Sequence, residues 1–201
     1  MPRQREFDEA TVLERARDLF WRRGYTATSI QDLEEHLGLS RSSLYRTFGG
    51  KRQLYDRTLA TYQEANLERL RRSLTSTKNL RASLNRLFTE AARQKHPDCA
   101  SRARGCYIVN ATTEMANNCA EALDFVAGNR ERFVALMEGA VARAQVRGEL
   151  EQQADPRELA NYLFVCYNGL QVVVQTKIGR DELVRAVERA VAGLPWQKAG
   201  Q

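Results

Sequence analysis

The sequence predicts an all-α protein, and three observations support this class. Apolar residues recur every three or four positions along most of the chain, which is the spacing of amphipathic helices. Only 4 of the 201 residues are proline and 12 are glycine. Runs of β-branched residues, which favour strands, are scarce, and the longest is Val172 to Val174. With 43% hydrophobic residues, the chain can also build a core.

Three short helices are expected in the first fifty residues. The first spans residues 8–23 and is ended by Gly24, the second spans residues 29–37, and the third spans residues 41–48. Each begins at a residue type that caps helix N-termini well: Asp8, Ser29 and Ser40. Asp32 follows Ser29 by three residues, near the position of a capping box.

Six more helices are expected in the remainder of the chain. Their ranges are residues 51–73, 80–96, 106–115, 125–147, 156–177 and 181–192. Pro156 favours the start of the fifth of these, because proline suits the first helical turn. We therefore expect one domain at residues 1–52, a second at residues 53–194, and a flexible tail at residues 195–201.

The positive charge is unevenly placed. Against 25 acidic residues the chain has 31 lysines and arginines, for a net charge of +6. Residues 1–60 carry a net +2, residues 61–110 carry +6, and residues 111–201 carry −2. Within the first part, residues 36–57 hold five basic groups and one acidic group. This excess permits nucleic-acid binding without requiring it.

Several classes of protein are disfavoured by the sequence. No segment approaches the roughly 18 apolar residues that cross a bilayer, and the N-terminus has no apolar signal core, so a cytoplasmic protein without membrane contact is expected. In that compartment the cysteines are not expected to form structural disulfides. No metal site is expected, because no Cys-x-x-Cys pair exists and His36 and His96 are far apart. No cofactor is expected either.

Residues 24–55 have the pattern of a helix-turn-helix. Two short helices flank a turn at Gly38, and their apolar residues would lock them together. The opposite face of residues 41–48 is polar and basic, with Arg41, Ser42, Tyr45 and Arg46. Such a helix suits the major groove, where arginine makes two hydrogen bonds to guanine and hydroxyl groups bind phosphates.

This stretch resembles the N-terminal DNA-binding domain of the TetR family of bacterial transcriptional regulators. The resemblance covers residues 8–58, and the helical remainder fits the family's variable ligand-binding and dimerisation domain more loosely. The matching residues are Gly24-Tyr25, Thr28-Ser29-Ile30, Asp32-Leu33, Gly38-Leu39-Ser40, Leu44-Tyr45, Phe48 and Lys51.

The resemblance implies a set of DNA contacts. Thr28, Tyr45 and Lys51 would contact phosphates, with Ser29 and Ser40 beside them at the helix starts. The residues that would face the groove or its walls are Arg41, Ser42, Ser43, Arg46 and Thr47. The family often has Gly or Ala at position 43 and His or Tyr at position 47. Because Ser43 and Thr47 depart from that, the operator sequence cannot be deduced.

A dimer is expected, because one helix-turn-helix contacts only a half-site. Residues 156–177 are apolar nearly all round, so something must bury this helix. Either it lies wholly inside its own monomer or, together with residues 181–192, it forms a homodimer interface. The resemblance favours the dimer, since the family builds its interface from its last two long helices.

A second motif centres on Cys106. It follows Gly105 where a basic segment enters a helix, and the helix N-terminus together with Arg102 and Arg104 is expected to favour the thiolate. Gly-Cys here, with Lys177-Ile178 near the end of the penultimate helix, resembles a TetR subgroup that senses electrophiles or oxidants. The alternative is that Cys106 is a small buried core residue.

A small-molecule inducer is the competing hypothesis for the signal. A pocket with a few polar groups for orientation would be lined by Tyr107, Asn110, Glu114, Met115, Phe133, Met137, Tyr162, Phe164, Tyr167 and Asn168, with Cys166 nearby. The same residues can instead be ordinary core. By either route the signal would release a repressor from its pseudo-palindromic operator.

Two other classes remain as alternatives. An enzyme is disfavoured, because the chain has no phosphate-binding glycine loop and no nucleophile and base at recognisable spacing, apart from His96 and Cys106. A non-specific, architectural DNA-binding protein is disfavoured by the net −2 of residues 111–201. Inducer, operator, regulated genes and the choice between repressor and activator cannot be deduced.

Overall fold

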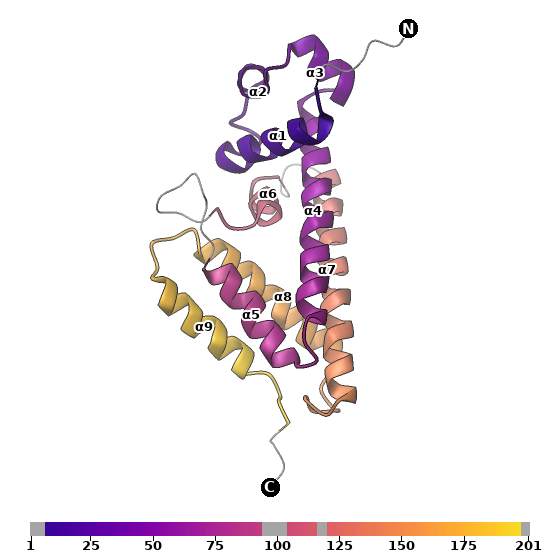
Figure 1. The fold of residues 1–201 in the computed structure, drawn as a ribbon, viewed down its shortest axis with the longest axis vertical. Helices are drawn as coiled ribbons and strands as arrows, with labels where there is room; N and C mark the ends of the chain where they lie inside the picture. Colours follow the sequence, from indigo (N-terminus) through magenta and orange to yellow (C-terminus); the bar gives the residue numbers. More distant parts are fainter. Residues whose placement is uncertain (1–6, 94–103, 116–119, 198–201) are drawn as a thin grey trace.

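The structure is a computed structural model that describes residues 7–93, 104–115 and 120–197. These ranges form helices and turns, with one isolated β-bridge, and the all-α prediction is confirmed (Figure 1). The helices are α1 (Glu9–Arg23), α2 (Ile30–Leu37), α3 (Arg41–Phe48), α4 (Lys51–Thr75), α5 (Leu80–Ala92), α6 (Tyr107–Met115), α7 (Ala120–Val146), α8 (Pro156–Val173) and α9 (Arg180–Ala192).

The starts of the first three helices follow their capping residues. Asp8 accepts hydrogen bonds from the backbone N–H groups of Ala10 and Thr11. Ser29 and Asp32 form a complete capping box, and Ser40 caps α3. Hydrogen bonds from the hydroxyl and backbone N–H of Ser29 lower the pKa of Asp32 to about 2. Local sequence therefore sets this unit.

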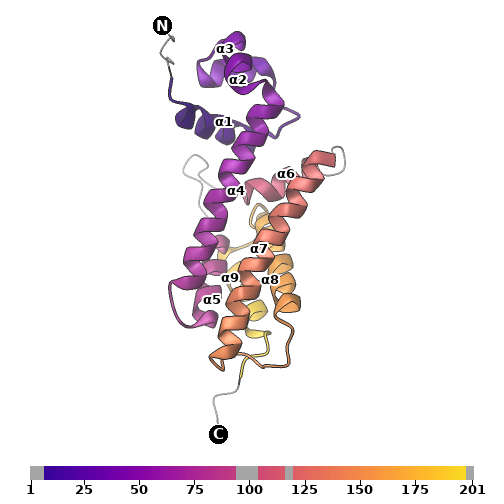
Figure 2. The ribbon, with the colours of Figure 1, turned by 90° about the vertical axis from the view of Figure 1, so that its right-hand side faces the viewer.

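The long helix α4 joins the two halves of the molecule. Figures 1 and 2 show it running from the α1–α3 unit at one end to the bundle of α5, α7, α8 and α9 at the other, with α6 between the two. One core packs α1–α3 against the first half of α4 and includes the apolar face of α6, from Cys106 to Met115. A second core fills the bundle. Helix α6 therefore belongs, by its packing, to the core of the N-terminal unit.

Several segments differ from their predicted form, and α5 ends at Ala92 instead of reaching residue 96. Helix α7 begins at Ala120 rather than Phe125, and α8 ends at Val173, four residues before Lys177. Residues 195–197, which the sequence assigned to a flexible tail, make contacts with the bundle: Trp196 donates its indole N–H to the carbonyl of Val191 and forms an isolated β-bridge with Leu150. Residues 198–201 lie outside the described ranges.

The described helices include none with both the length and the hydropathy of a membrane span.

Candidate nucleic-acid interface and regulatory site

Helix α3 presents one buried and one exposed face. Leu44 and Phe48 are buried in the N-terminal core. Arg41, Ser42, Tyr45 and Arg46 are exposed, and Tyr45 retains 45% of its accessible surface. Because α3 lies at one end of the molecule (Figures 1 and 2), nothing in the described chain covers this polar face.

The basic groups around α3 are held by local contacts. The Arg41 guanidinium lies 5.8 Å from the centre of the Tyr45 ring, and the Arg41 backbone N–H donates to the Glu34 carboxylate. The Lys51 ammonium lies 4.2 Å from the centre of the Tyr25 ring. Partial burial lowers the pKa of Lys51 from its ordinary value. The start of α4 thus adds an oriented cation beside the α3 face.

Some predicted DNA-contact residues have other roles in the structure. Thr28 is fully buried, and its hydroxyl donates to the carbonyl of Gly24 at 2.6 Å. The phosphate contact that the resemblance implies for Thr28 would therefore not come from its hydroxyl. Ser29 and Ser40 are exposed but serve as N-caps. Ser43 and Thr47 are half-buried, so they lie at the edge of the exposed face.

Cys106 lines a cleft of about 500 Å³. The cleft is bounded by α1, α4, α5, α8 and the start of α6, and aromatic rings from three of these helices line it: Trp21, Tyr62 and Tyr167. Its charged lining includes Arg17, Arg69, Glu14 and Glu90. Sequence reasoning missed the contribution of α1, because no local pattern indicates that the indole N–H of Trp21 donates a hydrogen bond to the carbonyl of Arg104, 83 residues away.

The Cys106 thiol is not activated as the sequence predicted. The side chain is only 7% exposed, and burial raises its pKa. Backbone N–H groups at the start of α6 and the Tyr62 hydroxyl, 3.7 Å from the sulfur, oppose that rise without cancelling it. The expectation of a favoured thiolate is therefore wrong, since desolvation outweighs the helix terminus. Arg102 lies outside the described residues.

Three predicted sensor residues lie on α6 but do not share one pocket. Tyr107 is 1% exposed and shares a 2.9 Å hydrogen bond with Thr58 of α4. Asn110 donates to the carbonyl of Arg104 and accepts from Gln175. Glu114 instead reaches the turn between α1 and α2. These three side chains of α6 thus form hydrogen bonds with neighbouring segments of the protein.

The remaining predicted sensor residues are spread over α8 and the turn after it. Tyr162 is 42% exposed and donates its hydroxyl to the carbonyl of Ala190. Cys166 is half-buried against the bundle core. Lys177 is exposed, and within the described residues no hydrogen bond or ion pair joins it to Cys106. Of the α8 candidates, only Tyr167 lines the cleft with Cys106.

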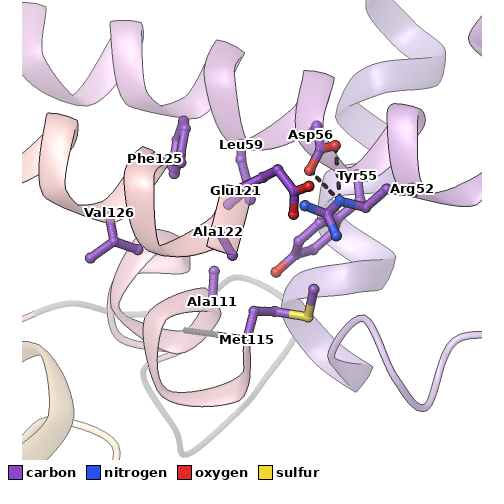
Figure 3. Close-up of a pocket in the computed structure, with 10 residues that line it drawn as sticks. All are labelled: Arg52, Tyr55, Asp56, Leu59, Ala111, Met115, Glu121, Ala122, Phe125 and Val126. Atoms are coloured by element: carbon purple, nitrogen blue, oxygen red, sulfur yellow. Dashed lines mark hydrogen bonds and ion pairs between the residues drawn. The ribbon is translucent and has the colours of Figure 1, made fainter. Parts of the chain in front are cut away.

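Two other hollows divide the rest of the predicted pocket. A cavity of about 180 Å³ lies between α4, α6 and α7, with Met115 and Phe125 in its wall and the Arg52–Asp56 ion pair at one end (Figure 3). A groove between α6, α7 and α8 contains Phe164 and Asn168. The other two predicted lining residues, Phe133 and Met137, are buried in the bundle core.

The outer face of α8 is apolar and uncovered by the described chain. Four of its large side chains are exposed by 38–68%: Tyr162, Val165, Val172 and Val173. Gly169 lies among them with open space beside it. Helix α9 buries its own apolar stripe, Leu183 to Val191, against the bundle. An exposed stripe of this kind marks an interaction surface.

No group of three metal-ligating side chains occurs in the described parts of the chain. His96, Cys99 and Cys119 lie outside those parts, so the pair of His96 and Cys106 considered under the disfavoured enzyme alternative has no structural description.

Comparison with known proteins matches both halves of the chain. The family model for bacterial regulatory proteins, tetR family, matches residues 12–58. The model for the tetracyclin repressor-like C-terminal domain matches residues 77–191. The HTH-type transcriptional regulator YezE of Bacillus subtilis, itself uncharacterized, is 30% identical over 96% of this chain and 100% of its own. The HTH-type transcriptional repressor ComR of Escherichia coli is 24% identical over 91% of this chain and 87% of its own.

Solved structures give the same result. A cysteine mutant of the TetR family regulator CifR, in complex with 26 bp of operator DNA, is 31% identical over 96% of this chain and 100% of its own, with a TM-score of 0.83. The reduced form of Escherichia coli NemR is 20% identical over 96% of this chain and 98% of its own, with a TM-score of 0.79, and therefore supports the fold alone.

Proposed function

We propose that this chain, which belongs to the TetR family of bacterial regulatory proteins and is thus a DNA-binding transcriptional regulator rather than an enzyme, acts as a dimeric repressor. The observation that carries this proposal is the exposed polar face of α3 on a helix whose other face is locked into the core. Two relatives support it, because ComR is named a repressor and the CifR structure is a complex with operator DNA. Such a protein would act in the cytoplasm, where the chromosome is.

In this proposal α3 enters the major groove of each half-site. Arg41, Ser42 and Arg46 would contact base edges, and Ser43 and Thr47 would line the walls of the groove. The phosphate contacts would come from Tyr45 and Lys51, which flank that face. Because one α3 covers one half-site, two copies would bind a pseudo-palindrome at half-sites about 34 Å apart or a multiple of that distance.

The homodimer would form through the exposed stripe of α8, with α9 beside it. Exposed valines and a tyrosine on one helix face are costly in water, and an identical stripe on a second copy can bury them. Val165, at 68% exposure, lies in the middle of the stripe. A Val165→Glu variant is therefore expected to be monomeric by sedimentation and to bind operator poorly, whereas Val165→Ile should stay dimeric.

The signal would enter through the cleft around Cys106. Its aromatic and charged lining suits a small inducer of mixed polarity. An electrophile with an electron-poor carbon–carbon double bond is the second candidate, and the position of Cys106 in the wall of that cleft favours it. The sulfur would add to one carbon as the π bond breaks, and the thiol proton, exchanged through solvent, would end on the neighbouring carbon. Inducer binding or thiol modification lowers operator affinity only if it favours the conformation that is released from DNA over the conformation that binds DNA.

The function is tested with the DNA upstream of the protein's own gene. The purified protein should retard this DNA in a gel, and the retardation should weaken as salt rises. Absence of retardation even at low salt would contradict the proposal. For the signal, an electrophile such as N-ethylmaleimide should release wild-type protein from this DNA, and Cys106→Ser should remain bound. Release of neither protein would leave only the small-molecule inducer, and equal release of both would show that Cys106 is not the thiol that responds.

A further inference from the structure

Near its C-terminal end, helix α6 contacts the α1–α3 unit through the side chain of Glu114. The two carboxylate oxygens of Glu114 accept hydrogen bonds from consecutive backbone N–H groups, Tyr25 at 2.9 Å and Thr26 at 2.7 Å. Both donors lie in the turn between α1 and α2, nearly ninety residues away in sequence. Hydrogen bonds to an ionised acceptor are about twice as strong as neutral ones, so this contact fixes the turn firmly.

The fit of Glu114 to this turn is close. Gly24 has a φ of +82°, in the region that favours glycine. A Cβ atom at this position would lie 2.9 Å and 3.0 Å from the two carboxylate oxygens of Glu114. The glycine therefore serves two purposes, because it ends α1 and leaves room for the carboxylate.

The turn held by Glu114 leads directly to the DNA-facing groups. Tyr25 stacks under the Lys51 ammonium, 4.2 Å from its ring centre, and its ring also packs on Tyr55 of α4. Three residues after Thr26, Ser29 caps α2, and α2 packs on α3. A displacement of Glu114 would thus be transmitted to α3 and to Lys51 together.

The other end of α6 adjoins the cleft that Cys106 lines. Cys106 precedes its first residue, and the Tyr107 ring packs on Trp21 of α1 and on Tyr62 of α4. Gly105 approaches α8 so closely that a Cβ atom there would be 2.3 Å from the carbonyl oxygen of Gln171. At nine residues, α6 is a rod of about 13 Å. It therefore connects the cleft and α8 to the α1–α2 turn.

We propose that Glu114 is the positioning residue that sets α2 and α3 relative to the regulatory domain and so sets operator affinity. The inference rests on operator binding as proposed above and on no particular signal. A relative solved on operator DNA shares the overall fold of this structure over 96% of the chain, with a TM-score of 0.83. Loss of the Glu114 contact is therefore expected to weaken DNA binding.

The test compares two variants that each remove one negative charge. Glu114→Gln keeps the shape of the side chain but loses the second acceptor oxygen, and Asp124→Asn makes the same charge change at an exposed position of α7. The probe is a duplex selected from a random pool with the wild-type protein. Glu114→Gln should lower affinity for it about tenfold, within the range of allosteric couplings, and Asp124→Asn less than twofold. Equal affinity of Glu114→Gln and wild type would overturn the inference.

A second measurement separates positioning from simple stabilisation. In a background with Cys99, Cys119 and Cys166 replaced by serine, a disulfide reagent reports access to Cys106. Because coupling is reciprocal, bound operator should slow this labelling in wild type and slow it much less in Glu114→Gln. Equal slowing in both proteins, or no slowing in wild type, would contradict transmission through α6.

A third variant covers the case in which Glu114→Gln folds poorly. Gly24→Ala forces a Cβ against the carboxylate, so its cost to operator affinity should be smaller in a Glu114→Ala background than in wild type. Additive costs would refute the role of Glu114. If the wild-type protein selects no duplex at all, the proposed function fails first, and that result is distinct from each of these.

Discussion

Helices α3 and α6 are similar in length, at 8 and 9 residues, but they carry out opposite tasks. Helix α3 buries one face and leaves a basic, hydroxyl-rich face open to solvent. Helix α6 is buried along its apolar face and uses its polar side chains on other segments of the protein. The first is built to meet a partner, and the second is built to hold two parts of the molecule together.

The difference teaches which kind of functional residue a sequence reveals. The role of α3 follows from residues within about a turn of it, because caps, apolar spacing and exposed arginines are all local. The role of α6 follows from contacts to Tyr25, Thr58 and Tyr62, which lie 44 to 89 residues away. The local sequence of α6 led to the prediction of a favoured Cys106 thiolate and of one shared ligand pocket. Neither is found as predicted.

The largest expected effect comes from the open face of α3. Replacing Arg41 and Arg46 together by alanine should weaken operator binding by about a hundredfold or more, because each lost base contact costs about 1–3 kcal/mol and the dimer has two copies. The thermal midpoint should stay near that of wild type, since both side chains are exposed. Fluorescence anisotropy and calorimetry measure the two quantities. Lys78→Ala, an exposed change in the α4–α5 turn, is the control.

The next effect concerns the buried thiol beside α6. Burial raises the pKa of Cys106, so less thiolate is present at neutral pH than in an unfolded chain. With the other three cysteines replaced by serine, alkylation of folded protein by iodoacetamide at pH 7.5 should be slower than in urea, because burial both raises the pKa of the thiol and limits access of the reagent to a side chain that is 7% exposed. An alkylation rate equal to that of the unfolded chain would contradict this and would support the favoured Cys106 thiolate that the sequence suggested.

A smaller effect is expected from the hydrogen bond between α6 and α4. Tyr107→Phe removes the 2.9 Å bond to Thr58 and should lower the free energy of unfolding by about 1 kcal/mol. Thr58 keeps its bond to the carbonyl of Tyr55, so no buried hydroxyl is left without a partner. Urea unfolding of Tyr107→Phe, Thr58→Val and the double variant should show a coupling between them. Strict additivity would mean that the bond contributes nothing.

The smallest effect lies in the local structure that precedes α3. Ser29→Ala removes the cap of α2 and should cost about 0.5–1 kcal/mol. Ser29 also holds the pKa of Asp32 at about 2 instead of 3.8. A lowered pKa in the folded state stabilises the protein above pH 4, and this contribution is lost as the pH falls towards 2. Ser29→Ala should therefore show a shallower loss of stability over that interval, measured by thermal unfolding, than wild type.

Sequence reasoning found most of the fold for identifiable reasons. The starts of α1, α2, α3 and α8 were predicted at Asp8, Ser29, Ser40 and Asp155-Pro156, because capping is encoded within four residues. Helix ends were harder. Helix α8 ends at Val173, although the sequence stays helical in pattern up to Lys177. The turn after it is held by its own backbone hydrogen bonds, from Gln175 and Thr176 to Val172 and Val173.

The candidate site was predicted in part. The exposed positions of α3 are those that the helical spacing of the sequence predicts. The contacts of Thr28 and Glu114, in contrast, are evident only in the folded structure. Thr28 looks like a polar residue at a helix start, yet its hydroxyl donates a hydrogen bond to the carbonyl of Gly24. Trp196 follows Pro195 in a segment that looks like a tail, yet the Arg81 guanidinium lies 4.6 Å from its ring centre. Contacts between distant segments decide the cases of Glu114 and Trp196, and a single sequence does not record them.

The most direct test of the central claim is the specificity of DNA binding at physiological salt. Wild-type protein should bind its selected duplex at least about a thousandfold more tightly than a scrambled duplex of the same length and composition. Anisotropy titrations of both duplexes under one buffer give the ratio. A ratio near one, with binding that only follows salt, would contradict an operator-specific regulator and would favour a non-specific DNA-binding protein instead.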